Sequence, residues 1–123
     1  MKDQSAPVAS VQLRLRVLAG KDIALGPGKV ELLRRVQETH SISAAARQMK
    51  MSYMRAWTLI QTMNRCFHKP VILAKRGGKE RGGAFLTETG EQVLALYAQL
   101  ETESLAATKT TRKTIISLLK AAA

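Results

Sequence analysis

The chain has 123 residues, enough for one domain of ordinary size, and 20 Lys and Arg against 9 Asp and Glu give it a net charge of +11. This excess predicts a polyanionic partner, nucleic acid before an anionic membrane surface. Hydrophobic residues make up 46% of the chain, which excludes wholesale disorder, and aromatic residues only 4%, which argues against a surface that stacks single-stranded bases. Double-stranded DNA is therefore the favoured partner.

Several classes of site and location are excluded by what the sequence lacks. A single cysteine, Cys66, excludes an intramolecular disulfide and indicates a reducing compartment. Neither a secretory signal nor a run of eighteen apolar residues is present, so we expect a cytoplasmic protein without a membrane partner. His40 and His68 have no companion ligands at metal-binding spacing, and no nucleophile is paired with a base. We therefore expect neither a metal site nor an enzyme.

The N-terminal half is predicted to contain a strand and three helices. Residues 1–10 are predicted to be a flexible arm. Residues 11–17 alternate apolar and polar side chains, which predicts a half-buried strand, and residues 23–25 can return beside it. Helical periodicity predicts a first helix over 28–39, a short second helix after a hydroxyl N-cap within 41–43, and a third helix over 52–67 that Ser52 opens. Trp57 lies beside the apolar stripe of the third helix and is expected to pack there.

The C-terminal half is predicted to contain a hairpin and a long helix. β-branched residues in 71–74 predict a strand, and residues 84–86 can return as its partner, which leaves a long basic tip between them. The last helix begins near Thr87, and residues 89–92 have the form of a capping box. Residues 11–105 are assigned to one domain. Residues 106–123 form a basic amphipathic tail, for which extending a dimer, touching a membrane and fraying all stay open.

This order of elements is that of a winged helix-turn-helix, mainly α with a small β component, an N-terminal strand or hairpin and a long C-terminal dimerisation helix. The third helix is expected to enter the major groove of DNA, and the basic hairpin, or wing, to lie along the backbone or in the minor groove. The residues predicted to contact DNA are polar or basic: Ser43, Ser52, Tyr53, Arg55, Thr58, Thr62, Arg65, Lys75, Arg76, Lys79 and Arg81.

The apolar stripe of the last helix is too long for a domain of this size to cover. We expect it to pack against a second copy of the chain through Val93, Leu96, Tyr97 and Leu100. Packing against the first helix of the same chain is the alternative.

A set of motifs occurs in one order along the chain: Ser-Ile-Ser-Ala-Ala-Ala at 41–46, Met-Ser-Tyr-Met-Arg-Ala-Trp at 51–57, Met-Asn at 63–64, Gly-Gly-Lys at 77–79, Gly-Gly-Ala at 82–84 and Leu-Thr-Glu-Thr-Gly at 86–90. Together they resemble the N-terminal DNA-binding domain of ModE-type molybdate-responsive transcription regulators, which is akin to the LysR-type winged helix-turn-helix. The resemblance covers about residues 11–105. It implies a homodimer on a palindromic operator of molybdate-related genes, with the last helix and the N-terminal strand at the dimer interface. Ser52, Tyr53 and Arg55 then fall on the reading end of the third helix, and Lys79 falls on the wing.

Two departures from that family stand out. Lys50 occupies a turn position where the family usually has a glycine, and a left-handed residue there would cost about 1 kcal/mol. The paired β-barrel modules with which full-length family members bind molybdate are absent from these residues, so we expect no cofactor in this chain. A separate effector-sensing protein is a further candidate partner. The alternative functions are a nucleoid- or RNA-binding basic protein without sequence specificity, and a module that meets an acidic protein.

Overall fold

Five helices and two small antiparallel sheets make up residues 8–75 and 83–120, the part of the chain that the computed structural model describes. The fold is mainly α with a small β component, as the sequence predicts. In chain order the elements are β1 (Val17–Ala19), β2 (Asp22–Leu25), α1 (Pro27–Thr39), α2 (Ile42–Gln48), α3 (Tyr53–Cys66), β3 (Ile72–Lys75), β4 (Gly83–Leu86), α4 (Glu88–Ala107) and α5 (Lys109–Ser117).

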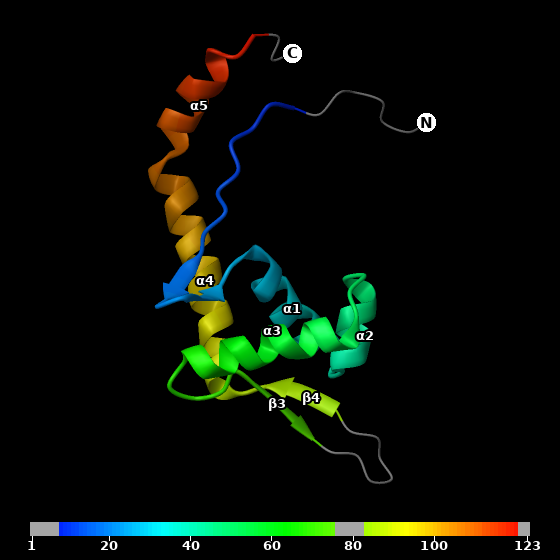
Figure 1. The fold of residues 1–123 in the computed structure, drawn as a ribbon. Helices are drawn as coiled ribbons and strands as arrows, with labels where there is room; N and C mark the ends of the chain where they lie inside the picture. Colours follow the sequence, from blue (N-terminus) through cyan, green and yellow to red (C-terminus); the bar gives the residue numbers. More distant parts are fainter. Residues whose placement is uncertain (1–7, 76–82, 121–123) are drawn as a thin grey trace, which may run out of the picture.

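The core lies where α1, α2 and α3 meet. Leu32, Leu33 and Val36 of α1 are fully buried, and Ile60 and Met63 of α3 belong to the same cluster. These apolar residues recur at intervals of three and four, so each helix turns one stripe inward. The sheet of β3 and β4 lies below α3, and α4 runs past α1 toward the chain termini (Figure 1).

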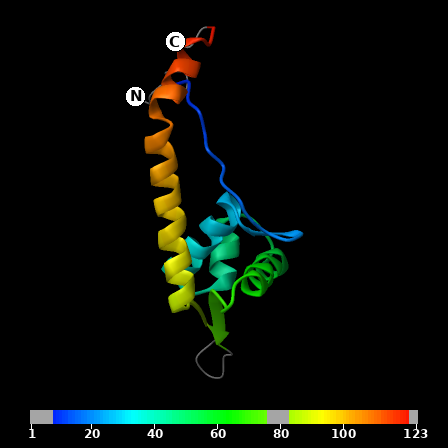
Figure 2. The ribbon, with the colours of Figure 1, turned by 90° about the vertical axis from the view of Figure 1, so that its left-hand side faces the viewer.

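The two C-terminal helices form one rod. The backbone N–H of Thr108 donates to Ser104 O at 3.2 Å, and that of Arg112 donates to Thr108 O at 2.9 Å, so helical hydrogen bonding continues across the junction of α4 and α5. The rod extends well beyond the helical body (Figure 2). Among the described residues, no helix is long and apolar enough to span a membrane.

The N-terminal strand is shorter than the sequence predicts. Residues 11–16 keep the expected alternation, with Val11, Leu13 and Leu15 half-buried, but only Val17–Ala19 pair with Asp22–Leu25. The prediction of a strand over residues 11–16 is therefore wrong, because β2 ends just before Pro27 opens α1 and no other strand of the described residues pairs with this segment. The extended segment instead lies near α4, where the hydroxyl of Tyr97 donates to Leu15 O at 2.7 Å.

The helix-turn-helix has the predicted caps. The Oγ of Ser41 accepts from the backbone N–H of Ala44 at 3.0 Å, and the Oγ of Ser52 accepts from that of Arg55 at 3.0 Å, so both hydroxyls satisfy a free donor at a helix N-terminus. Between the two helices Lys50 has φ 56°, which is the left-handed conformation that a glycine adopts without cost. The turn therefore has a left-handed residue at the position where the sequence raised that possibility, with a lysine in place of a glycine.

The wing is fastened to α3 by Asn64. Its Oδ1 accepts from the backbone N–H of Val71 at 2.8 Å and of Ile72 at 3.2 Å, and its Nδ2 donates to Ile72 O at 3.0 Å. The strand that follows pairs with β4 in an antiparallel register that joins Ile72 to Leu86 and Lys75 to Gly83.

The start of α4 is fastened to the same strand. The cap is Thr87 rather than the predicted box at 89–92: its Oγ1 accepts from the N–H of Gly90 at 2.9 Å and donates to Pro70 O at 2.7 Å. A Cβ at Gly90 would lie 2.1 Å from Val71 O, so only glycine fits there. This contact explains why a glycine follows Thr87 at that spacing.

Candidate nucleic-acid interface

The N-terminal half of α3 presents an exposed polar face. Ala56, Ile60 and Met63 face the core, so Arg55 and Thr58 lie toward solvent. Four of the residues predicted to contact DNA are exposed at this end of the helix: Ser52, Tyr53, Arg55 and Thr58.

The hydroxyl groups of this face differ in whether they can still donate a hydrogen bond to a ligand. Thr58 Oγ1 donates to Met54 O at 2.9 Å, and Thr62 Oγ1 donates to Thr58 O at 3.1 Å. In these rotamers both threonines have only acceptor lone pairs left for an outside ligand. Ser52 Oγ accepts from its own helix and keeps its proton, so Ser52 can donate to a phosphate oxygen.

The predicted contact residues of α3, which include Arg55 and Arg65, are divided between the two ends of the helix. Arg65 lies ten residues after Arg55, about 15 Å farther along the helix, and its guanidinium forms an ion pair with Asp22 of β2 at 3.7 Å. Both partners are largely exposed, so the pair contributes little to stability, but it directs Arg65 toward the β1–β2 hairpin. Arg55 and Thr58 therefore stay together at one end, and Arg65 belongs to the other.

A groove joins α2, α3 and the wing. It encloses about 200 Å³ and brings together three predicted contact residues, Ser43, Tyr53 and Lys75. The wing reaches α2 because the backbone N–H of Ala84 donates to the carbonyl of His40 at 3.0 Å, at the junction of α1 and α2. The other lining residues are Ser41, Ile42, Ala74, Gly83 and Ala84. The predicted wing residues Arg76, Lys79 and Arg81 lie outside the described residues.

Trp57 and Met54 are further exposed residues at this end of α3, and the sequence did not predict their exposure. Met54 is 63% exposed and Trp57 is 36% exposed, although Trp57 was expected to pack. The ring of Trp57 stacks on that of Tyr53, with centroids 6.4 Å apart and an angle of 13° between the planes. The sequence could have predicted this pair, because Tyr53 and Trp57 are four residues apart and such residues lie on the same side of a helix.

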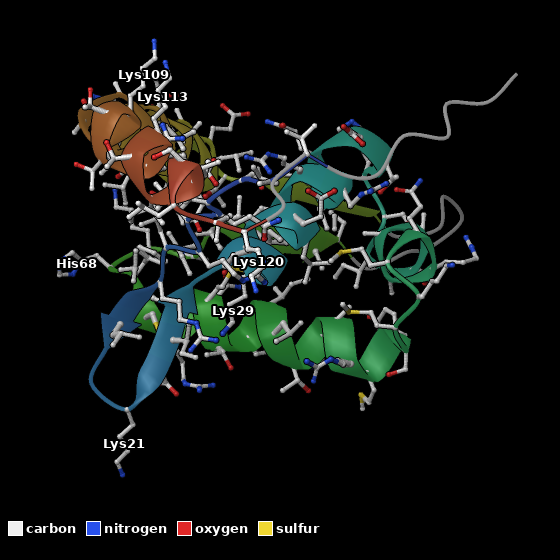
Figure 3. All side chains as sticks on the ribbon, turned by 90° about the horizontal axis from the view of Figure 1, so that it is seen from above. Lys21, Lys29, His68, Lys109, Lys113 and Lys120 are labelled. Atoms are coloured by element: carbon white, nitrogen blue, oxygen red, sulfur yellow. The ribbon has the colours of Figure 1, made fainter. Side chains whose placement is uncertain are left out.

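The electrostatics of this region are one-sided. The sequence contains no Asp or Glu between Glu38 and Glu80, a span that includes α2, α3 and β3. Arg47, Lys50, Arg55 and Lys75 are all exposed within it. The acids of the rod, by contrast, lie on α4, and Lys109 and Lys113 project outward from α5 in the view along the rod (Figure 3). The helix-turn-helix therefore has a surface suited to a polyanion.

The predicted dimer stripe is divided by the structure. Val93 is 9% exposed and Tyr97 is 3% exposed, because both pack into the core of their own chain. Their assignment to a surface stripe is therefore corrected. Leu96 and Leu100 remain, 56% and 40% exposed. Burial raises the pKa of the Tyr97 phenol above its usual 10.0, and the Glu101 carboxylate adds to the shift.

Within the described ranges no three His, Cys, Asp or Glu side chains are grouped so that they could hold a metal ion. Cys66 is half-buried at the end of α3 with a free thiol. The polar chemistry of this site is therefore that of hydrogen bonding and charge.

The chain is similar in sequence to proteins that carry the names ModE and MopB. It is 44% identical over 85 residues to the molybdenum-pterin-binding protein MopB of Rhodobacter capsulatus. The aligned region covers 69% of this chain and 32% of that protein. It is 34% identical over 92 residues to the transcriptional regulator ModE of Haemophilus influenzae. Here the aligned region covers 75% of this chain and 36% of that protein. The chain spans about a third of the length of the curated relatives it matches. No protein-family model matches it.

A solved structure supports the fold. A LysR family transcriptional regulator superposes with a TM-score of 0.50 and 18% identity, over 68% of this chain and 27% of the other. At this identity the likeness concerns the fold alone. The chain is thus homologous to the ModE and MopB proteins over 69% to 75% of its length, as the resemblance predicts, and it has a LysR-type winged helix-turn-helix fold.

Proposed function

We propose that this chain is a transcription regulator that binds double-stranded DNA sequence-specifically as a homodimer. The observation that carries the proposal is the acid-free face on which the N-terminal half of α3, the start of α2 and the base of the wing meet. An α-helix fits the major groove of B-DNA, and the basic residues around it neutralise phosphates.

The proposed DNA contacts are of two kinds: contacts to bases, which read the sequence, and contacts to phosphates, which position the protein. Arg55, exposed near the start of α3, presents a fork of donors that matches the acceptors of guanine. We expect Ser52 at the helix N-terminus and Lys75 at the end of β3 to bind DNA phosphates, because Ser52 keeps a free hydroxyl proton and Lys75 lines the groove beside α3. The names of the relatives support promoters of molybdate-related genes as targets.

The rod supports a homodimer. An apolar hollow of about 180 Å³ lies beside α4, and Leu96 and Leu100 border it while remaining exposed. A second copy placed by a two-fold axis would bury both leucines. Half-sites about 34 Å apart, one turn of DNA, are then expected. Leu96→Glu should give monomers in sedimentation velocity, whereas Leu118→Glu, which changes an 80% exposed leucine beyond the end of α5, should leave dimers. Dimers in both variants would contradict this interface.

Arg55→Ala tests the reading helix. We expect a loss of about 1–3 kcal/mol in binding to a duplex selected by this chain from a random pool, together with relaxed preference at one or two base pairs. Lys109→Ala is the matched control, because it removes the same charge from the exposed surface of α5. Equal effects of the two variants would contradict the assignment of α3.

Lys75→Ala tests the proposed phosphate contact at the base of the wing. It should weaken all duplex sequences alike and reduce the slope of log affinity against log salt by about one. Fluorescence anisotropy at several salt concentrations measures both quantities. A loss confined to one sequence would contradict a phosphate contact.

The second candidate is a basic protein that coats nucleic acid without reading sequence. The outward-facing lysines of α5 favour it, because they lie away from α3 and add charge without adding a reading surface. Competition between random duplex DNA and random single-stranded RNA at fixed salt separates the two functions. Equal affinity for all sequences would establish the second candidate.

A further inference from the structure

The exposed face of α3 carries an apolar ridge formed by Tyr53, Met54 and Trp57. Large apolar side chains are normally found in the core, and the core face of this helix is already complete with Ala56, Ile60 and Met63. The ridge lies on the N-terminal half of α3, as Arg55 does, but its aromatic pair borders the wing side of the helix, where Tyr53 and Lys75 line one groove. It is therefore next to the surface that the proposed function turns toward DNA.

Two members of the ridge contact each other. Tyr53 and Trp57 stack on each other, and a stacked pair loses less side-chain entropy on binding than two separate side chains. Tyr53 borders the groove that contains Lys75, and Trp57 borders a second hollow of about 200 Å³ between α3 and β3. The aromatic pair is therefore an apolar edge between two hollows.

The surroundings define the ligand as a polyanion with an apolar group at its surface. Lys75 lines the groove that Tyr53 borders, Lys50 and Arg55 are exposed in the turn before α3 and in its first turn, and the segment from residue 39 to 79 contains no acid. On the floor of the major groove, the apolar group that base pairs present is the C5 methyl of thymine. Single-stranded nucleic acid is less suited, because it needs aromatic platforms spaced along the strand and the described α3 offers one stacked pair.

We propose that the ridge of Tyr53, Met54 and Trp57 contacts thymine methyl groups in the major groove and selects thymine at those positions. This inference rests on the proposed function and adds the chemical group that the helix reads. Arg55 supplies hydrogen bonding from the same turns of α3, whereas the ridge supplies a contact that excludes water from a methyl group.

Deoxyuridine substitution tests the proposal with the unaltered protein. The probe is a duplex that this chain selects from a random pool, and its counterpart has every thymidine replaced by deoxyuridine, which removes only the methyl groups. We expect affinity to fall about fourfold for each methyl that the ridge buries. Single replacements should locate the effect at one or two positions in each half-site. Equal affinity for the two duplexes would overturn the inference and leave the proposed function intact.

Variants assign the effect to the ridge. Trp57→Ala or Met54→Ala should abolish the preference for thymine over uracil, whereas Leu118→Ala, a matched removal of an exposed apolar side chain on the tail, should preserve it. Retention of the full preference by both ridge variants would overturn the proposal. Preferential binding of a single-stranded pool over all duplexes would overturn the proposal and the proposed function together.

The fluorescence of Trp57 gives a readout that needs no variant, because it is the sole tryptophan of the chain. Saturation with the selected duplex should change its emission intensity and wavelength, with a smaller change for the deoxyuridine duplex. Unchanged emission at saturation, with binding followed by a label on the DNA, would place Trp57 outside the interface and overturn the inference.

Discussion

At the junction between the wing and α4, we expect a glycine-to-alanine substitution to destabilise the chain, although such a change inside a helix usually stabilises it. Replacing glycine by alanine inside a helix ordinarily stabilises a protein by about 0.5–1 kcal/mol. At Gly90 the new Cβ would lie 2.1 Å from Val71 O and 3.0 Å from Val71 C. The Val71 carbonyl also accepts from the backbone N–H of Thr87 at 3.0 Å, so it is not free to move away. Either α4 or the start of β3 must shift by more than 1 Å to reach ordinary contact at about 3.4 Å.

Gly90→Ala should therefore destabilise the chain by about 3 kcal/mol or more, at the upper end of the range for overpacked sites. For a domain of this size the midpoint of thermal unfolding should fall by roughly 10 °C. Urea titration followed by circular dichroism measures the free energy of unfolding directly.

Gly28→Ala is the matched control. Gly28 lies in the first turn of α1, and a Cβ there would meet nothing within 4 Å, so alanine should leave the stability unchanged or raise it by up to about 1 kcal/mol. If Gly90→Ala proved as stable as Gly28→Ala, the close approach of α4 to β3 would not exist and the geometry of the wing would need revision.

Three further predictions concern stability. Lys50→Gly should raise the free energy of unfolding by up to about 1 kcal/mol, because φ 56° suits glycine; a decrease in urea titrations would refute the strain. Asn64→Ala should cost about 1–3 kcal/mol, since the N–H groups of Val71 and Ile72 lose their acceptor; unaltered stability would show that water replaces it. The raised pKa of Tyr97 means that the unfolded chain loses this proton first, so stability should fall as pH rises above about 10, and Tyr97→Phe should lessen that fall. If the free energy of unfolding fell equally in the unaltered chain and in Tyr97→Phe between pH 9 and 11, Tyr97 would not be the group responsible.

Local signals in the sequence predicted the helices and their starts. α1 and α3 follow apolar residues at intervals of three and four, and Ser52 caps α3 because its hydroxyl reaches a backbone donor within one turn. These features depend on neighbours along the chain, which a sequence displays. The left-handed Lys50 could also be anticipated, from the glycine that the similar family has there.

Features that depend on distant partners could not be predicted. Residues 11–16 alternate like a strand, but whether they pair depends on where β2 ends. Arg65 is drawn to Asp22, which lies 43 residues earlier in the chain. The stripe on α4 is periodic along its whole length, yet α1 and the core cover Val93 and Tyr97 while Leu96 stays exposed. A hydrophobic pattern shows that a residue is apolar, and the tertiary arrangement decides what covers it.

We propose that the N-terminal half of α3 and the base of the wing form the surface that binds duplex DNA. Amide chemical-shift mapping during titration with a selected duplex can locate that surface residue by residue. We expect the largest shifts in residues 41–43, 52–58, 72–75 and 83–86, with small shifts in α5. Shifts concentrated in Lys109–Ser117, with α3 unaffected, would contradict it.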